Sequence, residues 1–205
     1  MRKFTTLAMV ALLAACKPAA DKAPAPDSSD AEPAAPAVPE AKADGPNAAT
    51  TAVSLDGEGL RFVDKTSGKT SLLAFGVPRV QAETALANVA GKEDDRSTNA
   101  ECGAGSMEFT RYDAMTLNFQ DGKFAGWFLG NEPGAATYST MSGIGVGTTR
   151  AKAAESVTIV DIEDSTLGEE FSIGTGEKVI GGMFAAPGDA AKIDALFAGT
   201  NCFFR

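Results

Sequence analysis

The feature that most limits what this chain can fold into is the segment 17–50, because its composition does not support a folded structure. They contain seven of the ten prolines and twelve alanines, no aromatic residue, and Val38 as their only large aliphatic side chain. A segment of this composition buries too little apolar area to offset the entropy lost when it becomes ordered. We therefore expect a disordered, extended linker at residues 16–52 and a folded part at residues 53–205.

The first residues have the pattern of an export signal. Arg2 and Lys3 precede an uncharged, mostly apolar run from Phe4 to Ala15, which is shorter than the ~20 residues that a membrane-spanning helix needs. A basic start, a short apolar core and small residues at the end are typical of a secretory signal peptide. The predicted signal peptide is residues 1–15.

This signal ends in Leu13-Ala14-Ala15-Cys16, which resembles the lipobox of bacterial lipoproteins. The resemblance implies cleavage before Cys16 and attachment of acyl chains such as palmitate. Each buried CH₂ contributes ~0.8 kcal/mol, so several chains form a firm lipid anchor. The expected location is the cell envelope. Lys17, by resemblance to enterobacterial lipoproteins, favours the outer membrane, with the protein facing the periplasm.

Composition argues against several classes of function. The chain has 18 basic and 27 acidic side chains, a formal net charge of −9, and no histidine. Nucleic-acid binding needs clustered lysine and arginine and is not expected. Histidine is the usual general base at neutral pH and the commonest transition-metal ligand. We therefore expect no catalytic site, no metal and no cofactor.

The first half of the folded part shows clear local signals. Apolar and polar residues alternate on both sides of Asp121-Gly122, a pattern that predicts a β-hairpin. Pro78 and Gly91 are suited to the two ends of a helix. The predicted strands are residues 60–64, 71–75, 107–112, 115–119 and 124–128.

The second half repeats this order. Gly147-Thr148-Thr149-Arg150 precedes a short predicted helix, as Gly76-Val77-Pro78-Arg79 precedes the first. Further strands are expected at 157–162, 167–173 and 179–184, followed by a final helix over 189–199. These patterns predict an α+β fold of two helix-plus-antiparallel-sheet units, 53–135 and 136–205, related by an old duplication.

This arrangement, with the stretch Gly145–Arg150, resembles the BLIP-like fold of β-lactamase inhibitor proteins and of SmpA/OmlA outer-membrane lipoproteins. In those families a Gly-x-Thr/Ser turn begins a short helix in front of a curved antiparallel sheet. The Gly-x-Pro that usually follows their helices is missing here. The resemblance implies a BLIP-like tandem repeat and, as one function, inhibition of an envelope hydrolase.

A second resemblance concerns Asn99-Ala100-Glu101-Cys102-Gly103 and Asn201-Cys202, which look like segments of small exported proteins sometimes labelled aspartate-semialdehyde dehydrogenase. That enzyme needs an NADP-binding βαβ unit, a thiolate and a histidine acid/base. This chain has no histidine and no Gly-x-Gly-x-x-Gly after a strand. The residues therefore do not support the activity.

With Cys16 assigned to lipid, Cys102 and Cys202 remain. An exported compartment permits disulfides, and an even number of remaining cysteines favours one. We predict a structural Cys102–Cys202 bridge; the alternative is a reactive thiol. Such a bridge closes a loop of ~100 residues, which contributes up to ~4–5 kcal/mol in the chain-entropy model.

Two aromatic residues are candidates for partner contact. Trp127, the only tryptophan, is expected on the strand face opposite Phe124 and Phe128, either in the core beneath a helix or as an exposed anchor in a partner-binding concavity. Tyr138 is the second such candidate. The glycine-rich stretch 143–147 is interpreted as a turn that caps the following helix, and the acidic runs 93–95 and 161–164 as solvated loop charge.

Together these features predict a lipid-anchored cell-envelope protein that acts as a binding or structural module. Its expected contacts are the membrane, through the lipid on Cys16, and a protein partner in the envelope. Two alternatives remain: an inhibitor of an envelope hydrolase, and an enzyme that uses paired carboxylates.

Overall fold

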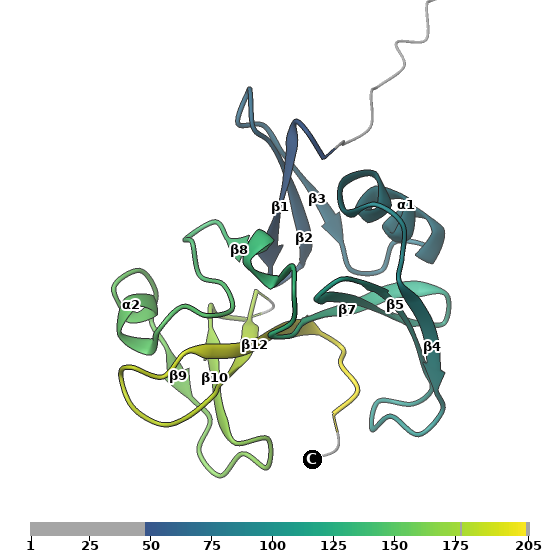
Figure 1. Ribbon diagram of the computed structural model, residues 1–205. Coiled ribbons are helices and arrows are strands. Elements are labelled where there is room, and N and C mark those ends of the chain that lie inside the picture. Colours follow the sequence, from purple (N-terminus) through teal and green to yellow (C-terminus); the bar gives the residue numbers. More distant parts are fainter. Residues whose placement is uncertain (1–47, 177, 204–205) are drawn as a thin grey trace, which may run out of the picture. The chain divides into compact units, whose positions relative to one another are not determined.

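The computed structural model describes residues 48–176 and 178–203 (Figure 1). The predicted signal peptide, the predicted lipidation site Cys16 and the predicted linker up to residue 47 lie outside the described residues. Within the described part, neither helix has both the length and the apolar character that a membrane crossing requires.

The described chain is mostly β, which corrects the predicted fold class. Strands make up 42% of it, and its two α-helices are α1, Arg79–Ala90, and α2, Arg150–Ala154. The predicted α+β fold of two helix-plus-antiparallel-sheet units, a BLIP-like tandem repeat, is therefore wrong. The strands form two separate sheets instead.

The first sheet has the strand order β3-β2-β1-β8 (Figure 1). Its strands are β1 (Thr51–Asp56), β2 (Gly59–Asp64), β3 (Thr70–Ala74) and β8 (Ser139–Thr140). The predicted strands at 60–64 and 71–75 are confirmed as an antiparallel pair. Helix α1 follows Pro78 and ends at Gly91, as predicted, and buries Ala82 and Leu86.

The second sheet has eight strands in the order β4-β5-β6-β7-β12-β11-β10-β9. The strands are β4 (Asp95–Asn99), β5 (Met107–Tyr112), β6 (Met115–Gln120), β7 (Lys123–Leu129), β9 (Val160–Asp161), β10 (Glu169–Ile173), β11 (Ile180–Phe184) and β12 (Ile193–Gly199). The β6–β7 hairpin and the neighbouring β5 confirm the strongest local prediction. Every neighbouring pair is antiparallel.

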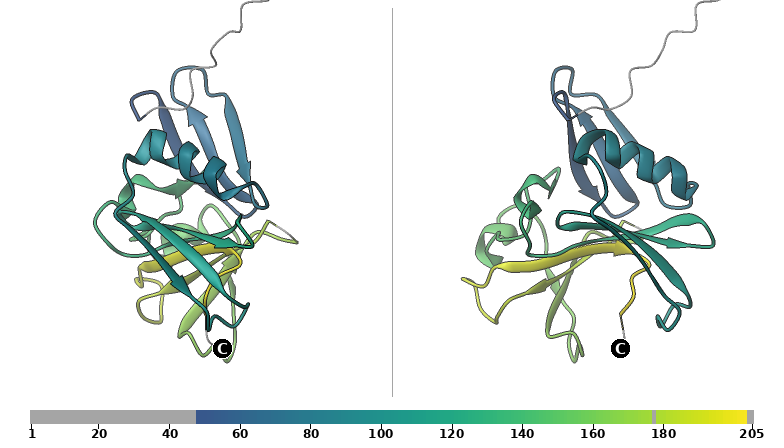
Figure 2. Two further views of the ribbon diagram at one scale, coloured as in Figure 1. Left: turned by 90° about the vertical axis from the view of Figure 1, so that its right-hand side faces the viewer. Right: turned by 45° about the vertical axis from the view of Figure 1, so that its right-hand side comes forward.

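The middle of this sheet lies beneath the first sheet, and the C-terminal segment leaves β12 on the opposite side (Figures 1 and 2). We call the side toward the first sheet the core face and the other side the open face. A short 3₁₀ turn, Ala135–Thr137, precedes β8. The main core residues fill the space at the core face: Leu55, Leu60, Phe62, Leu86, Met115, Leu117, Phe119, Phe124, Trp127 and Leu129.

The final predicted helix, residues 189–199, is wrong: a turn at 189–190 is followed by strand β12, Ile193–Gly199. Ile193, Leu196 and Phe197 have the spacing of a helix face, yet residues 195–198 are all buried. β12 lies in the middle of the sheet and is covered on both faces, so its apolar residues do not alternate with polar ones. A central strand of this kind is easily mistaken for a helix.

A β-bulge in β7 changes the face of Trp127. Phe124 pairs with Phe119 and Trp127 with Leu117, which leaves Ala125 without a cross-strand partner. One extra residue reverses the alternation of a strand. Phe124 and Trp127 therefore share the core face, and the prediction that they point to opposite faces is wrong.

Two adjacent glycines of β11 lie beneath phenylalanine rings from opposite faces of the sheet. A Cβ on Gly181 would be 2.3 Å from Cε2 of Phe197, and one on Gly182 would be 2.4 Å from Cζ of Phe171. Overpacking of this kind costs roughly 1–3 kcal/mol. We expect Gly182→Ala to lower the free energy of unfolding by that amount in urea titrations.

The matched control is Gly130→Ala, whose Cβ would meet Phe128 at an ordinary 3.4 Å. Its unfolding midpoint should stay close to that of the unchanged protein. Equal effects of the two substitutions would contradict the tight packing at Gly182.

Candidate binding surface on the eight-stranded sheet

The open face carries a cluster of aromatic side chains. The ring of Phe203 lies 4.7 Å from that of Phe197 and 6.3 Å from that of Phe128, measured between centroids. Phe203 belongs to residues 200–203, the described end of the chain. A hollow of about 280 Å³ lies beside these rings. It is lined by Phe109, Phe128 and Phe203, and we call it the aromatic hollow.

A larger depression lies next to it. It has a volume of about 500 Å³, and its lining is mostly apolar, including Phe75, Ile162, Phe171 and Phe197. We call it the apolar groove. Because Phe197 of the groove touches Phe203 of the hollow, the two depressions are neighbours.

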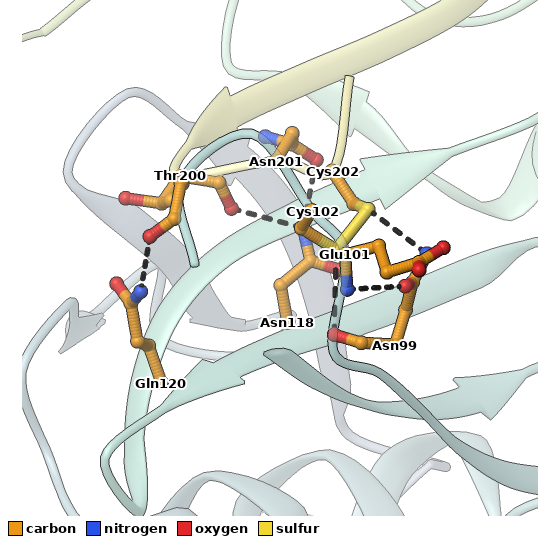
Figure 3. The surroundings of a disulfide bond; sticks show 9 residues. Asn99, Glu101, Cys102, Asn118, Gln120, Thr200, Asn201 and Cys202 are labelled. Atoms are coloured by element: carbon orange, nitrogen blue, oxygen red, sulfur yellow. Dashed lines mark hydrogen bonds between the residues drawn. A yellow bond between two sulfur atoms is a disulfide. The ribbon is translucent and has the colours of Figure 1, made fainter. Parts of the chain in front are cut away.

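Hydrogen bonds hold the C-terminal segment against the sheet. The side-chain amide of Asn118 donates to the carbonyl of Thr200 at 3.1 Å and to Oδ1 of Asn201 at 2.7 Å (Figure 3). The backbone N–H of Thr200 donates to the carbonyl of Ala125 at 2.8 Å. The bulge that reverses β7 thus also supplies an acceptor for this segment. Asn118 is almost fully buried, so its position is well defined by packing.

The disulfide completes this attachment. Cys102 and Cys202 are bonded, with an S–S distance of 2.07 Å and Cα atoms 4.9 Å apart (Figure 3). This confirms the predicted pair, and a bonded pair leaves neither sulfur as a reactive thiol. The side-chain amide of Asn99, the last residue of β4, lies 3.5 Å from Sγ of Cys202. The bridge therefore fastens the C-terminal segment to the far end of the sheet.

The two predicted partner contacts are not at this surface. Trp127 has no exposed area, and its Nε1–H donates to the carbonyl of Asp56 at 3.0 Å. Tyr138 is only 6% exposed. Neither side chain is accessible to a partner, so the interpretation of Trp127 as core is the correct one. On the open face, the partly exposed Phe203 lies against the ring of Phe197, which is itself buried.

Burial also affects the two tyrosines of the chain, Tyr112 and Tyr138. Desolvation raises the pKa of each phenol to about 12, from the ordinary value of 10.0. The neutral phenols therefore contribute stability that is fully present below pH 10.0 and is lost as the pH rises toward 12. We expect tyrosinate absorbance of the native protein to appear only near pH 12, and near pH 10 in concentrated urea.

A native titration at the ordinary tyrosine pKa would contradict the burial of both rings. The matched check is Tyr138→Phe, which should halve the native absorbance change and leave its midpoint unchanged. Loss of stability above pH 10 should be smaller in this variant, because one of the two shifted groups is gone.

The core face carries two arginines that stack on aromatic rings. Arg79, the first residue of α1, lies 4.9 Å from the ring centroid of Phe119, and Arg150, the first residue of α2, lies 4.1 Å from that of Phe184. Cation–π contacts of this kind stabilise packing. They attach the start of each helix to the second sheet.

Glu83 links α1 to β5. Burial raises its pKa, but hydrogen bonds from Thr110 and Arg79 and the charges of Arg79 and Arg96 outweigh burial, so the pKa lies below its ordinary value. Glu83 accepts hydrogen bonds from Thr110 at 2.7 Å and Arg79 at 2.8 Å. Glu83 therefore stays ionised near neutral pH. It acts as a structural contact between α1 and β5 and not as a proton donor.

Other motifs also have structural places. Thr149 caps α2 by accepting a hydrogen bond from the backbone N–H of Lys152 at 3.3 Å, which confirms that 143–147 belongs to a helix-capping turn. Of the two acidic runs, Glu93 pairs with Arg96 at 3.5 Å and Asp161 with Arg150 at 2.6 Å. Among residues 48–176 and 178–203, no three or more acidic or cysteine side chains are grouped as metal ligands.

The chain matches no family model, no curated protein and no solved structure. Function is therefore inferred from the open face itself. Sequence reasoning missed this surface, although one signal for it was present. The predicted Cys102–Cys202 bridge already required Phe203 to lie close to the loop that follows β4.

Proposed function

We propose that this protein is a lipid-anchored, noncatalytic binding module of the cell envelope, and that the open face of its eight-stranded sheet contacts a protein partner. The observation that carries the proposal is the pair of neighbouring depressions around Phe197 and Phe203. Aromatic side chains in such depressions are typical of the centres of protein interfaces.

The attachment of the C-terminal segment to the open face supports this proposal. Hydrogen bonds from Asn118 and the disulfide hold the C-terminal segment in place. A surface that is already ordered loses little conformational entropy when a partner binds. The open face is therefore suited to recognition without rearrangement.

The N-terminal features support the envelope location. Cys16 would carry the lipid, and residues 17–50 of the linker would span roughly 100 Å if fully extended, at ~3.1 Å per residue. Such a linker would let the binding domain reach partners well away from the membrane surface. Inhibition of an envelope hydrolase is a narrower form of the same proposal.

The test is photocrosslinking in intact cells. A photoreactive amino acid replaces Thr116, which lines the aromatic hollow, or Ser172, which lines the apolar groove. The control position is Val80, which is 70% exposed on α1. We expect the first two positions, and not Val80, to capture the same protein.

A second arm uses Cys16→Ser. The same partner should be captured from Thr116 in this variant in an envelope extract, because recognition belongs to the folded part. Mass spectrometry of the N-terminal peptide should find acyl chains on Cys16 in the unchanged protein only. Equal capture from Val80, or none from Thr116 and Ser172, would overturn the proposed binding face; an unmodified Cys16 would overturn the anchor.

A further inference from the structure

A third depression lies at the β9 edge of the sheet, next to the apolar groove, with Asp161 and Glu169 on the side of the core face. It has a volume of about 300 Å³ and is lined by the carboxylates of Asp161, Asp164, Glu169 and Glu170, with Arg150. We call it the acidic pocket. Ile162 and Glu170 line both the acidic pocket and the apolar groove, so the two share a wall.

The acidic pocket is not neutralised by its own arginine. Arg150 lies 2.6 Å from Oδ1 of Asp161 and 3.8 Å from Oε2 of Glu169, and its guanidinium stacks on Phe184. Arg150 thus pairs with two of these acids, and Asp164 adds a third exposed carboxylate to the pocket. Asp161 and Glu169 are 60% and 44% exposed, so an approaching ligand meets their negative charge directly.

The apolar groove beside this pocket is suited to a different kind of ligand group. The apolar side chains that the groove exposes include Ile162, which is 38% exposed, and the half-buried Val179, beside the buried ring of Phe197. Apolar area of this kind favours an aromatic or aliphatic side chain. A ligand that fills both depressions must therefore combine an apolar group with a positive charge.

We infer that the apolar groove and the acidic pocket together bind an extended segment of the protein partner, with an aromatic or aliphatic side chain in the groove and a nearby lysine or arginine in the pocket. This inference rests on the proposed function and names the chemistry of its partner. Charge complementarity selects the occupant, since anionic segments are repelled. The formal net charge of −9 adds to the same preference at longer range.

The test uses labelled alanine-based hexapeptides and the full lipidated protein in phosphatidylcholine nanodiscs. Each peptide carries one phenylalanine, with one arginine placed one, two or three residues away. Matched peptides carry glutamate in place of arginine, or alanine in place of phenylalanine. We expect at least one arginine peptide to bind about tenfold more tightly than its glutamate match, a difference of ~1.4 kcal/mol.

Protein variants locate the effect. The double variant Asp164→Asn and Glu169→Gln should remove most of the preference for arginine and leave the contribution of phenylalanine. Asp164 has a φ of 57°, a conformation that asparagine also tolerates, so this change is mild. The control is Glu132→Gln, at an exposed acid that does not line either depression. This substitution should leave the peptide affinities unchanged.

A complementary variant fills the apolar groove with a large side chain. Ser172→Trp should weaken every phenylalanine-containing peptide. If glutamate and arginine peptides bind equally well, or if the acidic double variant keeps its preference for arginine, the inference is overturned while binding at the groove stands. If no peptide binds and photocrosslinking at Thr116 and Ser172 also fails, both the inference and the proposed function are overturned.

Discussion

Replacing both Cys102 and Cys202 with alanine is expected to lower the free energy of unfolding by about 4 kcal/mol. The two cysteines are 100 residues apart in a chain of 205, so the bond restricts about half of the unfolded chain. Loop-closure entropy grows slowly with length, and a bridge of this span lies near the upper end of its range. Small domains have only ~5–15 kcal/mol of stability in total, so the loss should be large.

Urea titrations followed by circular dichroism measure this change. Reductant should lower the free energy of unfolding of the unchanged protein by a similar amount and should leave that of the double alanine variant unchanged. The hydrogen bonds from Asn118 remain in that variant, so we expect a folded protein with a loosened C-terminal segment. A hydrophobic dye should then bind more strongly, because Phe128 and Phe197 lose part of their cover.

Two results would count against this account. Identical urea midpoints for the double variant and the unchanged protein would show that the bridge contributes little to stability. A reductant effect that persists in the double variant would show that the loss arises elsewhere in the chain.

Trp127→Ala is expected to destabilise the fold by about 3–5 kcal/mol. The indole is completely buried between the two sheets, and its cross-strand partners are Leu117 and Ala198. The substitution removes a large apolar volume from the centre of the core. It also removes the hydrogen bond to Asp56, which joins β7 to the end of β1.

A graded series separates these two contributions. Trp127→Phe keeps an aromatic ring but loses the N–H donor, and we expect a cost of about 1–3 kcal/mol. Val80→Ala, at a 70% exposed position, should have almost no effect. Circular dichroism is the suitable probe, since the variants at position 127 lack the only tryptophan.

Fluorescence of the unchanged protein gives an independent check. Trp127 should emit at short wavelength and resist quenching by acrylamide until the protein unfolds. Quenching in native conditions as strong as in urea would place the indole at the surface. That result would also revive Trp127 as a partner contact.

Features with local causes were predictable from the sequence. The turn of the β6–β7 hairpin has positive φ at Asp121, 51°, and Gly122, 71°, as a tight two-residue turn requires. The limits of α1 at Pro78 and Gly91 depend likewise on backbone preferences of single residues. No distant part of the chain is needed to explain these elements.

Features with distant causes were predicted wrongly. Residues 193–199 have the spacing of a helix face but form β12, because β7 and β11 pair with both of its edges and its side chains at 195–198 are buried on both sides of the sheet. The bulge at Ala125 likewise depends on a tertiary contact, since its carbonyl accepts from Thr200. Periodicity in the sequence contains neither contact.

The candidate site divides in the same way. The sequence by itself determined the lack of any histidine-based chemistry and the pairing of Cys102 with Cys202, because these follow from residue types and counts, and the export signal that ends before Cys16 is predicted on the same basis. Only the tertiary structure decided that Trp127 is buried and that Phe203 lies partly exposed on the open face, against Phe197. The side of a strand that remains uncovered depends on which distant segments pack against it, and no local pattern of residues encodes that packing.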